Sequence, residues 1–168
     1  MSELKRTQLY ETHVAAGASM VDFGGWEMPV QYPTGIVAEH LYTRHFCSLF
    51  DVSHMGRLLI EGPERLAFLQ HVLSSNVAGL DLNMAQYCIL PDEDGGAVDD
   101  AYLYRFEEER FLLVVNAGQH GEGSDASALR GEGLRHAPSR SITSRWASIA
   151  VQGPKSKDLL TTSPAGYR

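Results

Sequence analysis

The chain has few of the features that mark secreted, membrane-spanning or nucleic-acid-binding proteins. Its only two cysteines, Cys47 and Cys88, lack the spacing of a metal-binding pair and sit among apolar residues. No run of Lys or Arg is longer than Lys5-Arg6, and the formal net charge is −7, so the sequence offers no basic face for nucleic acid. No secretory signal is seen, and no apolar run approaches the length of a membrane span. These features predict two buried thiols in a cytoplasmic protein without nucleic-acid or membrane partners.

The 168 residues allow one or two small domains, and an apolar content of 43% is enough to form a buried core. Two short helices are predicted near residues 8–16 and 35–47, with Thr7 and Thr34 as their N-caps. The segment between them, "MVDFGGWEMPVQYP", is punctuated by glycine and proline and is predicted to be neither strand nor helix.

From residue 55 onward, strands and helices alternate. Period-two or continuous apolar patterns predict strands at "MGRLLIEG", "AQYCILPDE", "AVDDAYLYRF", "FLLVVNA" and "WASIAVQG". Helices are predicted after Pro63, over residues 121–136 and at "PKSKDLL". The nearly continuous apolar run "FLLVVNA" is typical of a central strand. The order predicts an α+β fold class, with split βαβ-like antiparallel or mixed sheets and helices on one face.

The stretch "DEDGGAVDDAYLYRF" contains the strongest candidate site. Alternate side chains of a strand share a face, so Asp100, Tyr102 and Tyr104 are expected on one side and Asp99 on the other. Tyr87 on the preceding strand is expected to converge with them, and so is Asn116 on the following strand.

A carboxylate with aromatic walls suits a planar ligand that carries N–H donors, because one carboxylate accepts two charge-assisted hydrogen bonds. The alternative is that one Asp closes the turn after Gly95-Gly96 and the other is solvated.

Two other segments are weaker candidates. "FGGWEMPVQYP" can equally be a rigid surface loop held by Trp26. "FDVSHMGRL" contains Asp51, Ser53 and His54, but members of a catalytic triad meet through tertiary structure rather than as near neighbours. The histidines do not form an H-E-x-x-H pattern, so no metal site is expected.

Five segments together resemble the N-terminal part of the glycine cleavage system T-protein family of aminomethyltransferases. They cover almost all of residues 3–160, in the family's order: "LKRTQLYETHVAAGASMVDFGGWEMPVQYPTGIVAEH", "FDVSHMG", "NMAQYCILPDEDGGAVDDAYLYRF", "FLLVVNA" and "ASIAVQGPKSKDLL". The resemblance implies transfer of the one-carbon unit from the aminomethyl-lipoyl H-protein to tetrahydrofolate, with release of ammonia. The alternatives are a non-catalytic folate-binding or interaction remnant and a folate-dependent demethylase.

The resemblance also implies a division of the chain. Residues 1–50 would form the N-terminal helices and loop of a first domain, and 51–140 a folate-binding α+β subdomain. Residues 141–168 would form a return strand and the start of a helix of the first domain.

The resemblance assigns roles to five residues. Asp100 matches the catalytic carboxylate, and Asp99 is its turn-side neighbour. Tyr87, Tyr104 and Asn116 match folate-contacting positions. Met55, in "SHMG", matches a position beside the pterin.

Two departures from the family are expected to matter. The segment "GQHGEGSDASALRGEG" is rich in glycine, which weakens a helix there. Complete family members are much longer, so the chain is expected to be truncated and its folate site half-lined. A second polypeptide or self-association would then complete the fold.

Overall fold

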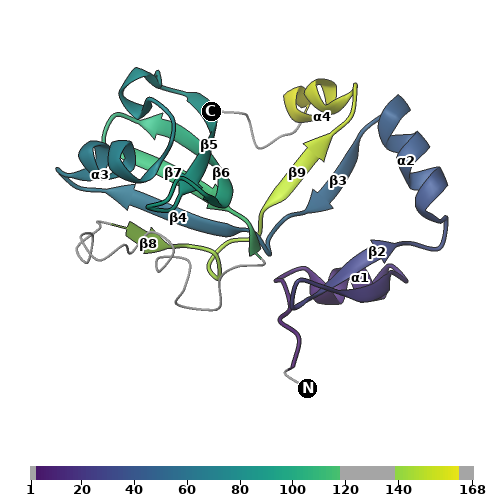
Figure 1. Ribbon diagram of the computed structural model, residues 1–168. Coiled ribbons are helices and arrows are strands. Elements are labelled where there is room, and N and C mark those ends of the chain that lie inside the picture. The colour runs from purple at the N-terminus through teal and green to yellow at the C-terminus, as the bar shows by residue number, and fades with distance from the viewer. Residues whose placement is uncertain (1–2, 118–138, 163–168) are drawn as a thin grey trace. The chain divides into compact units, whose positions relative to one another are not determined.

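The computed structural model describes residues 3–117 and 139–162, which form two compact units. Of the described residues, 3–54 and 146–162 form unit 1, and 55–117 and 139–145 form unit 2 (Figure 1). The mixed α+β fold class with antiparallel sheets is confirmed. The helix predicted over residues 121–136 lies outside the described residues. Among the helices of the described ranges, none is long and apolar enough to cross a membrane.

Unit 2 is built on a five-stranded antiparallel sheet with the order β5-β6-β7-β4-β8. Its elements, in chain order, are β4 Gly56–Glu61, α3 Arg65–Val72, the 3-10 helix η1 Val77–Gly79, β5 Met84–Pro91, β6 Ala97–Glu107, β7 Arg110–Val115 and β8 Ser139–Ser141. The prediction of a central strand at "FLLVVNA" is confirmed, because β7 lies between β6 and β4.

The core of unit 2 lies between one face of this sheet and helix α3. Leu58, Leu103 and Leu113 from three strands pack with Phe68 and Leu69 of the helix, and all five side chains are buried. Residues that alternate with them point to the opposite face of the sheet, as the strand period requires. Asp100, Tyr102 and Phe106 of β6 are therefore exposed on that second face, and Tyr104 is half-buried there.

Unit 1 contains two separate two-stranded antiparallel sheets, one of β1 with β2 and the other of β3 with β9. Its elements, in chain order, are α1 Tyr10–Ala15, β1 Ser19–Phe23, β2 Trp26–Gln31, α2 Ile36–His45, β3 Ser48–Asp51, β9 Ile149–Gln152 and α4 Ser156–Thr162.

The prediction that "MVDFGGWEMPVQYP" is neither strand nor helix is wrong, because this segment forms the β1–β2 hairpin. Gly24 and Gly25 have φ angles of 59° and 86°. Positive φ at both central residues gives a turn that matches the twist of the flanking strands. Pro29 is tolerated in β2 because, among the described residues, the strand pairs with another strand only on the β1 side, and the isolated bridge from Lys5 on its other side is at Trp26.

The predicted threonine N-caps are also wrong. Helix α2 follows Gly35, whose φ is 83°, and no side chain caps it. Helix α1 follows Leu9 rather than Thr7 and likewise has no side-chain cap. The hydroxyl of Thr7 accepts a hydrogen bond from the backbone N–H of Leu9 at 3.3 Å, but it donates to Asp51 at 2.7 Å.

Both cysteines are free thiols. Cys88, on β5, is buried, as predicted, whereas Cys47 is only half-buried. Burial, with a smaller effect of the nearby Asp100 charge, raises the pKa of the Cys88 thiol to about 11.

Candidate functional site

The register of β5, β6 and β7 places Asp100 beside both of its predicted neighbours. Ile89 pairs with Asp100 across the β5–β6 ladder, and Ala101 pairs with Val115 across the β6–β7 ladder. Asn116 directly follows Val115, so the register carries it to the position beside Asp100. Tyr87 lies two residues before Ile89, which makes it a diagonal neighbour within reach of a long side chain.

Each oxygen of the Asp100 carboxylate accepts a hydrogen bond from a neighbouring strand. The Tyr87 hydroxyl donates to Oδ2 at 3.0 Å, and the Asn116 side-chain Nδ2 donates to Oδ1 at 2.7 Å. The prediction that Tyr87, Asp100 and Asn116 converge therefore agrees with the geometry of unit 2. The carboxylate itself remains exposed.

The alternative reading, in which an aspartate of this pair closes the turn, is wrong. Asp99 and Asp100 both lie within strand β6. The turn is instead closed by Asp92, whose Oδ1 accepts hydrogen bonds from the backbone N–H groups of Asp94 and Gly96, at 3.1 Å and 2.6 Å.

Asp99, which was expected only as the turn-side neighbour of Asp100, also contacts Asn116. Its Oδ1 accepts a hydrogen bond from Asn116 Nδ2 at 2.8 Å, and its Oδ2 accepts one from the Asn116 backbone N–H at 3.2 Å. Asp99 therefore binds the same amide that binds Asp100. Strand alternation, which places successive side chains on opposite faces, gave no signal for this shared contact.

Aromatic side chains continue from Asp100 along the exposed face of the sheet. The ring centroids of Tyr87 and Tyr102 are 6.1 Å apart, and those of Tyr102 and Tyr104 are 5.6 Å apart. The ring of Phe106 stacks on Tyr104 with centroids 5.6 Å apart, a contact for which the sequence gave no specific indication. The four rings form an aromatic row next to a carboxylate, which suits a flat ligand with N–H donors.

The surroundings raise the pKa of two phenols in this row. For Tyr87, the hydrogen bond to Asp100 is the main cause, because a phenolate could not donate to the carboxylate. For Tyr104, burial is the main cause and the neighbouring Tyr102 adds to it. Both hydroxyls therefore stay protonated at neutral pH.

Met55 and Tyr104 are less closely tied to Asp100. Met55 immediately precedes β4, and the pairing of Gly56 with Val115 places it at the same end of the sheet as Asn116. Tyr104 is connected to the site through the ring of Tyr102. Within the described part of unit 2, neither residue has a hydrogen bond to Asp100.

The Asp51, Ser53 and His54 segment forms no triad, in agreement with the expectation from their spacing. The carboxylate of Asp51 binds His13 Nε2 at 3.0 Å rather than His54. The ring of His54 packs edge-on against Phe23, with centroids 5.5 Å apart. The Ser53 hydroxyl accepts a hydrogen bond from the backbone N–H of Ser148 at 2.9 Å.

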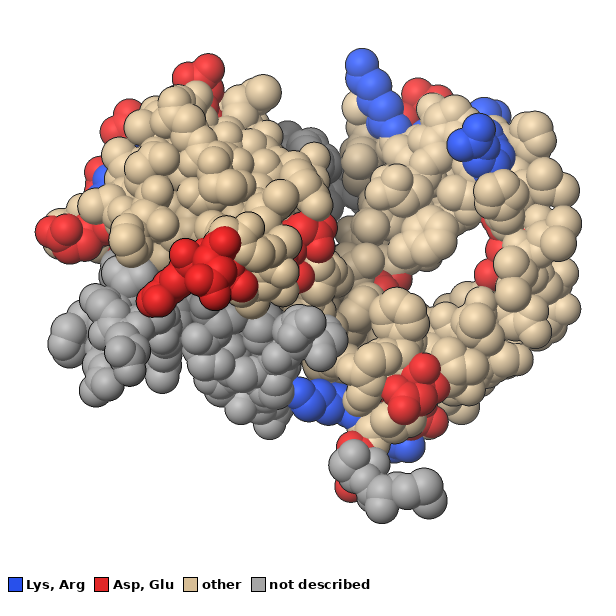
Figure 2. Space-filling model, in the orientation of Figure 1, with Lys and Arg blue, Asp and Glu red and all other residues tan. Residues whose placement is uncertain are grey.

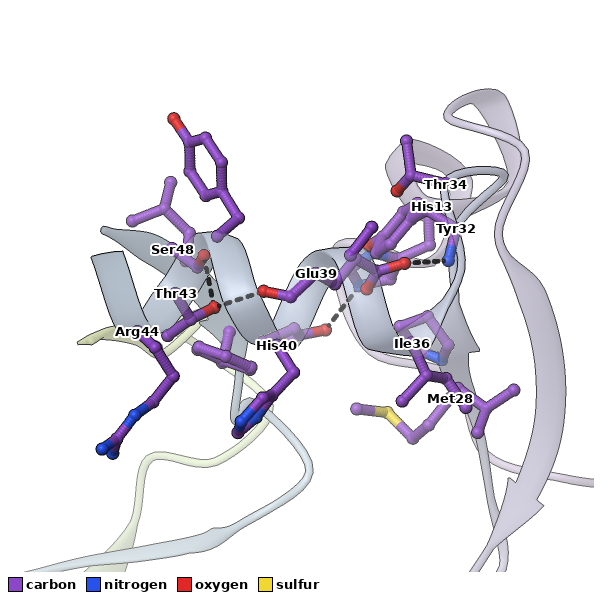
Figure 3. Close-up of a pocket in the computed structure, with 17 residues that line it drawn as sticks. His13, Met28, Tyr32, Thr34, Ile36, Glu39, His40, Thr43, Arg44 and Ser48 are labelled. Atoms are coloured by element: carbon purple, nitrogen blue, oxygen red, sulfur yellow. Dashed lines mark hydrogen bonds and ion pairs between the residues drawn. The ribbon is translucent and has the colours of Figure 1, made fainter. Parts of the chain in front are cut away.

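Unit 1 also contains a cavity of about 700 Å³, lined mainly by β2, α2 and β3. Figure 2 shows unit 1 hollowed between these elements, and Figure 3 shows the side chains around the hollow. Glu39 points toward Tyr32 and accepts its backbone N–H at 2.7 Å, while Thr43 bonds Ser48 at 2.7 Å (Figure 3). Most of the lining surface is apolar, but charged and polar side chains such as Glu39, His40 and Arg44 also line the cavity.

Comparison with known proteins identifies relatives of nearly the whole chain. The model of the GCVT N-terminal domain family matches residues 9–165. The chain is 46% identical to an aminomethyltransferase of Thermus thermophilus over 157 residues, covering 94% of this chain and 44% of the relative. It is 44% identical over 163 residues to an aminomethyltransferase of Desulfitobacterium hafniense, covering 95% of this chain and 43% of the relative.

A solved structure gives the same result for the fold. The crystal structure of the glycine cleavage system aminomethyltransferase T from Bartonella henselae matches with a TM-score of 0.81 and 38% identity, covering 94% of this chain and 43% of that one. The chain thus spans less than half the length of the relatives it matches. With a family model over most of its residues and relatives above 40% identity, the chain belongs to the GCVT N-terminal domain family, and it matches the N-terminal portion of relatives named aminomethyltransferase.

Proposed function

We propose that this chain provides the catalytic carboxylate of a tetrahydrofolate-dependent aminomethyltransferase. In the proposed reaction, the one-carbon unit carried by the lipoylated H-protein passes to tetrahydrofolate and ammonia is released. Asp100 is the proposed catalytic residue, and Met55, Tyr87, Tyr104 and Asn116 are the proposed contacts of the folate. The main support is that the Asp100 carboxylate is held by hydrogen bonds from two neighbouring strands next to the aromatic row.

The proposed role of Asp100 follows from charge. Tetrahydrofolate supplies an amine nitrogen, which gains positive charge as it bonds to the transferred carbon. A fixed carboxylate stabilises that charge without having to reorient, and it can accept the proton that the nitrogen releases. Tyr87 and Asn116 fix the carboxylate by holding one oxygen each. The remaining lone pairs of both oxygens are available to the ligand.

The residues present fit a folate. The aromatic row offers apolar ring surface to a planar pterin, and Asp100 accepts hydrogen bonds from its N–H groups. The site is also open, because the Tyr87 side chain is 55% exposed and that of Tyr102 46%. We therefore expect weaker folate binding by this chain than by a protein in which further residues cover the ligand.

The test is binding of tetrahydrofolate by calorimetry, followed by single-turnover transfer from aminomethyl-loaded H-protein. We expect Asp100→Asn to bind folate more weakly and to lose transfer by about 10²–10³-fold, the usual cost of removing one stabilising group. Asp94→Asn, which makes the same charge change at an exposed position of the adjacent turn, is the matched control and should behave as wild type. Wild-type turnover in Asp100→Asn would refute the assignment.

Two alternative functions give different results in the same assays. A non-catalytic folate-binding remnant would bind tetrahydrofolate but show no turnover with loaded H-protein. A folate-dependent demethylase would bind tetrahydrofolate but take its one-carbon unit from a methylated amine or sulfonium compound without needing H-protein.

An interaction role for unit 1 is supported by a separate observation. Among the described residues of unit 1, Met28 is the only apolar side chain that is buried. Large apolar side chains remain exposed instead, including Ile36, Val37, Leu49 and Phe50. Such a surface is normally covered in a stable protein. We propose that this surface is covered either by a second chain that corresponds to the remainder of the longer relatives or, in the absence of that chain, by another copy of this chain.

A native mass spectrum of the purified chain tests this proposal. Co-expression with the remaining half of a relative should give a one-to-one complex, and the chain alone should self-associate. A stable monomer that does not bind the added half would contradict the proposal.

A further inference from the structure

Asp99 makes a two-point contact with Asn116 that fixes the orientation of its side-chain amide. One carboxylate oxygen accepts the side-chain N–H at 2.8 Å, and the other accepts the backbone N–H at 3.2 Å. The bond from the backbone N–H holds the Asp99 carboxylate in place, so its other oxygen offers the side-chain amide an acceptor at a fixed position. An amide turned by half a rotation would present its oxygen to Asp99, where two acceptors would face each other.

The orientation of this amide decides whether an N–H donor or an oxygen atom faces the Asp100 carboxylate. The Asn116 nitrogen has two hydrogens, and the two carboxylate oxygens nearest to it are Oδ1 of Asp99 at 2.8 Å and Oδ1 of Asp100 at 2.7 Å. The nitrogen therefore lies between two negatively charged groups and satisfies both. With the amide reversed, Asp100 would lose a donor and face an oxygen.

We propose that Asp99 is a positioning residue, which acts through Asn116 to hold the catalytic carboxylate of Asp100. This inference rests on the proposed function of Asp100. It also defines the contact that Asn116 can make with a ligand. Because both side-chain N–H groups are directed at carboxylates, the group Asn116 presents is its amide oxygen, which recognises an N–H donor on the folate.

The first measurement is the nuclear magnetic resonance signal of the Asn116 side-chain amide in the full chain. In the wild type, two hydrogens bound to carboxylates should give shifted signals that exchange slowly with water. Asp99→Ala should move these signals toward those of an exposed asparagine and speed their exchange. Asp94→Asn should leave them unchanged. If Asp99→Ala does not fold, Asp99→Asn is measured in its place. The same change in the Asn116 signals is expected, because the new amide nitrogen would face an N–H group of Asn116 instead of accepting from it.

The second measurement is a double-mutant cycle on tetrahydrofolate affinity. Asp99→Ala and Asn116→Ala should each weaken binding about tenfold, the loss expected when one hydrogen bond to a charged group is disordered. If Asp99 acts through Asn116, the double variant should also lose about tenfold. Two independent structural effects would multiply instead, to about a hundredfold.

The outcomes separate this inference from the proposed function. Unchanged Asn116 signals in Asp99→Ala, or multiplying losses in the cycle, would overturn the positioning role even if Asp100→Asn abolishes transfer. A wild-type chain that binds no tetrahydrofolate would refute the proposed function, but the amide signals would still decide whether Asp99 fixes Asn116.

Discussion

Removing the carboxylate of Asp51 should destabilise unit 1 more than any exposed charge change. The Asp51 side chain is 1% exposed and accepts hydrogen bonds from three residues of unit 1. The donors are the Thr7 hydroxyl at 2.7 Å, His13 Nε2 at 3.0 Å and the Ser53 backbone N–H at 2.9 Å. His13 is itself held at its other ring nitrogen by the Tyr32 hydroxyl at 2.8 Å. This buried polar network takes the place that an apolar core has in unit 2.

The expected magnitude follows from the donors that Asp51→Ala would leave behind. A buried polar group without a partner costs about 1–3 kcal/mol, and breaking a buried charged pair costs about 3–5 kcal/mol. Water entering the space would offset part of this cost. We therefore expect unit 1 to lose about 3 kcal/mol of its free energy of unfolding.

Tryptophan fluorescence during urea unfolding is the assay, because both tryptophans of the chain, Trp26 and Trp146, lie in unit 1. A loss of about 3 kcal/mol should lower the midpoint by more than about 1 M urea. Asp158→Asn, at an exposed position of α4, makes a charge change in the same unit and should shift the midpoint little. Equal midpoints for Asp51→Ala and Asp158→Asn would refute the reasoning.

The same network predicts how stability depends on pH. Burial alone would raise the pKa of Asp51, but hydrogen bonds from His13, Ser53 and Thr7 outweigh it and hold that pKa below its ordinary value. A carboxyl with a lowered folded-state pKa stabilises the protein above its unfolded pKa of about 4. That stability is lost as the pH falls through the lower folded value. The difference in the free energy of unfolding between wild type and Asp51→Ala should therefore become smaller at acidic pH.

Two further predictions concern single positions. In native protein, a thiol reagent at pH 8 should modify Cys47 and leave Cys88 unmodified, because Cys88 is 1% exposed and burial raises its pKa to about 11. Equal reaction rates of the two thiols would contradict this prediction. Gly153→Ala should lower the free energy of unfolding by more than about 1 kcal/mol in the same urea assay, because φ of Gly153 is +121° and the added Cβ would meet the backbone oxygens of Phe46 and Thr43. An unchanged midpoint would contradict this prediction, because it would show that the backbone adjusts freely.

Unit 2 could be predicted well from the sequence because its strands follow one another along the chain. Strands β5, β6 and β7 form a meander joined by short turns, so alternation along each strand already indicates which residues share a face. Tyr87 and Asn116 lie only 13 and 16 residues from Asp100, and their convergence follows from the register. The shared contact of Asp99 was not predictable, because it depends on Asn116 lying just beyond the last pair of the ladder.

Unit 1 was predicted poorly for two physical reasons. The β1–β2 hairpin was missed because glycine and proline were taken as breaks. Paired glycines with positive φ in fact form the turn, and Pro29 lies in an edge strand, which tolerates proline. Strand β3 was missed because its partner, β9, is almost a hundred residues away, as the hydrogen bond between Ser53 and Ser148 across 95 residues illustrates. No local pattern indicates a pairing over that distance.

This difference between local and distant contacts bears on what the chain can do by itself. Two of the three partners of Asp51 are 38 and 44 residues away, and the unit they hold together buries only Met28 among its described apolar side chains. The partners of Asp100 lie in one meander whose reverse face packs on the buried core of unit 2. The contacts that hold the Asp100 carboxylate are therefore expected to persist in unit 2 when unit 1 is unfolded. Tetrahydrofolate affinity should accordingly be unchanged by Asp51→Ala in conditions where unit 1 unfolds and unit 2 does not, and a parallel loss of affinity would show that the two units act together.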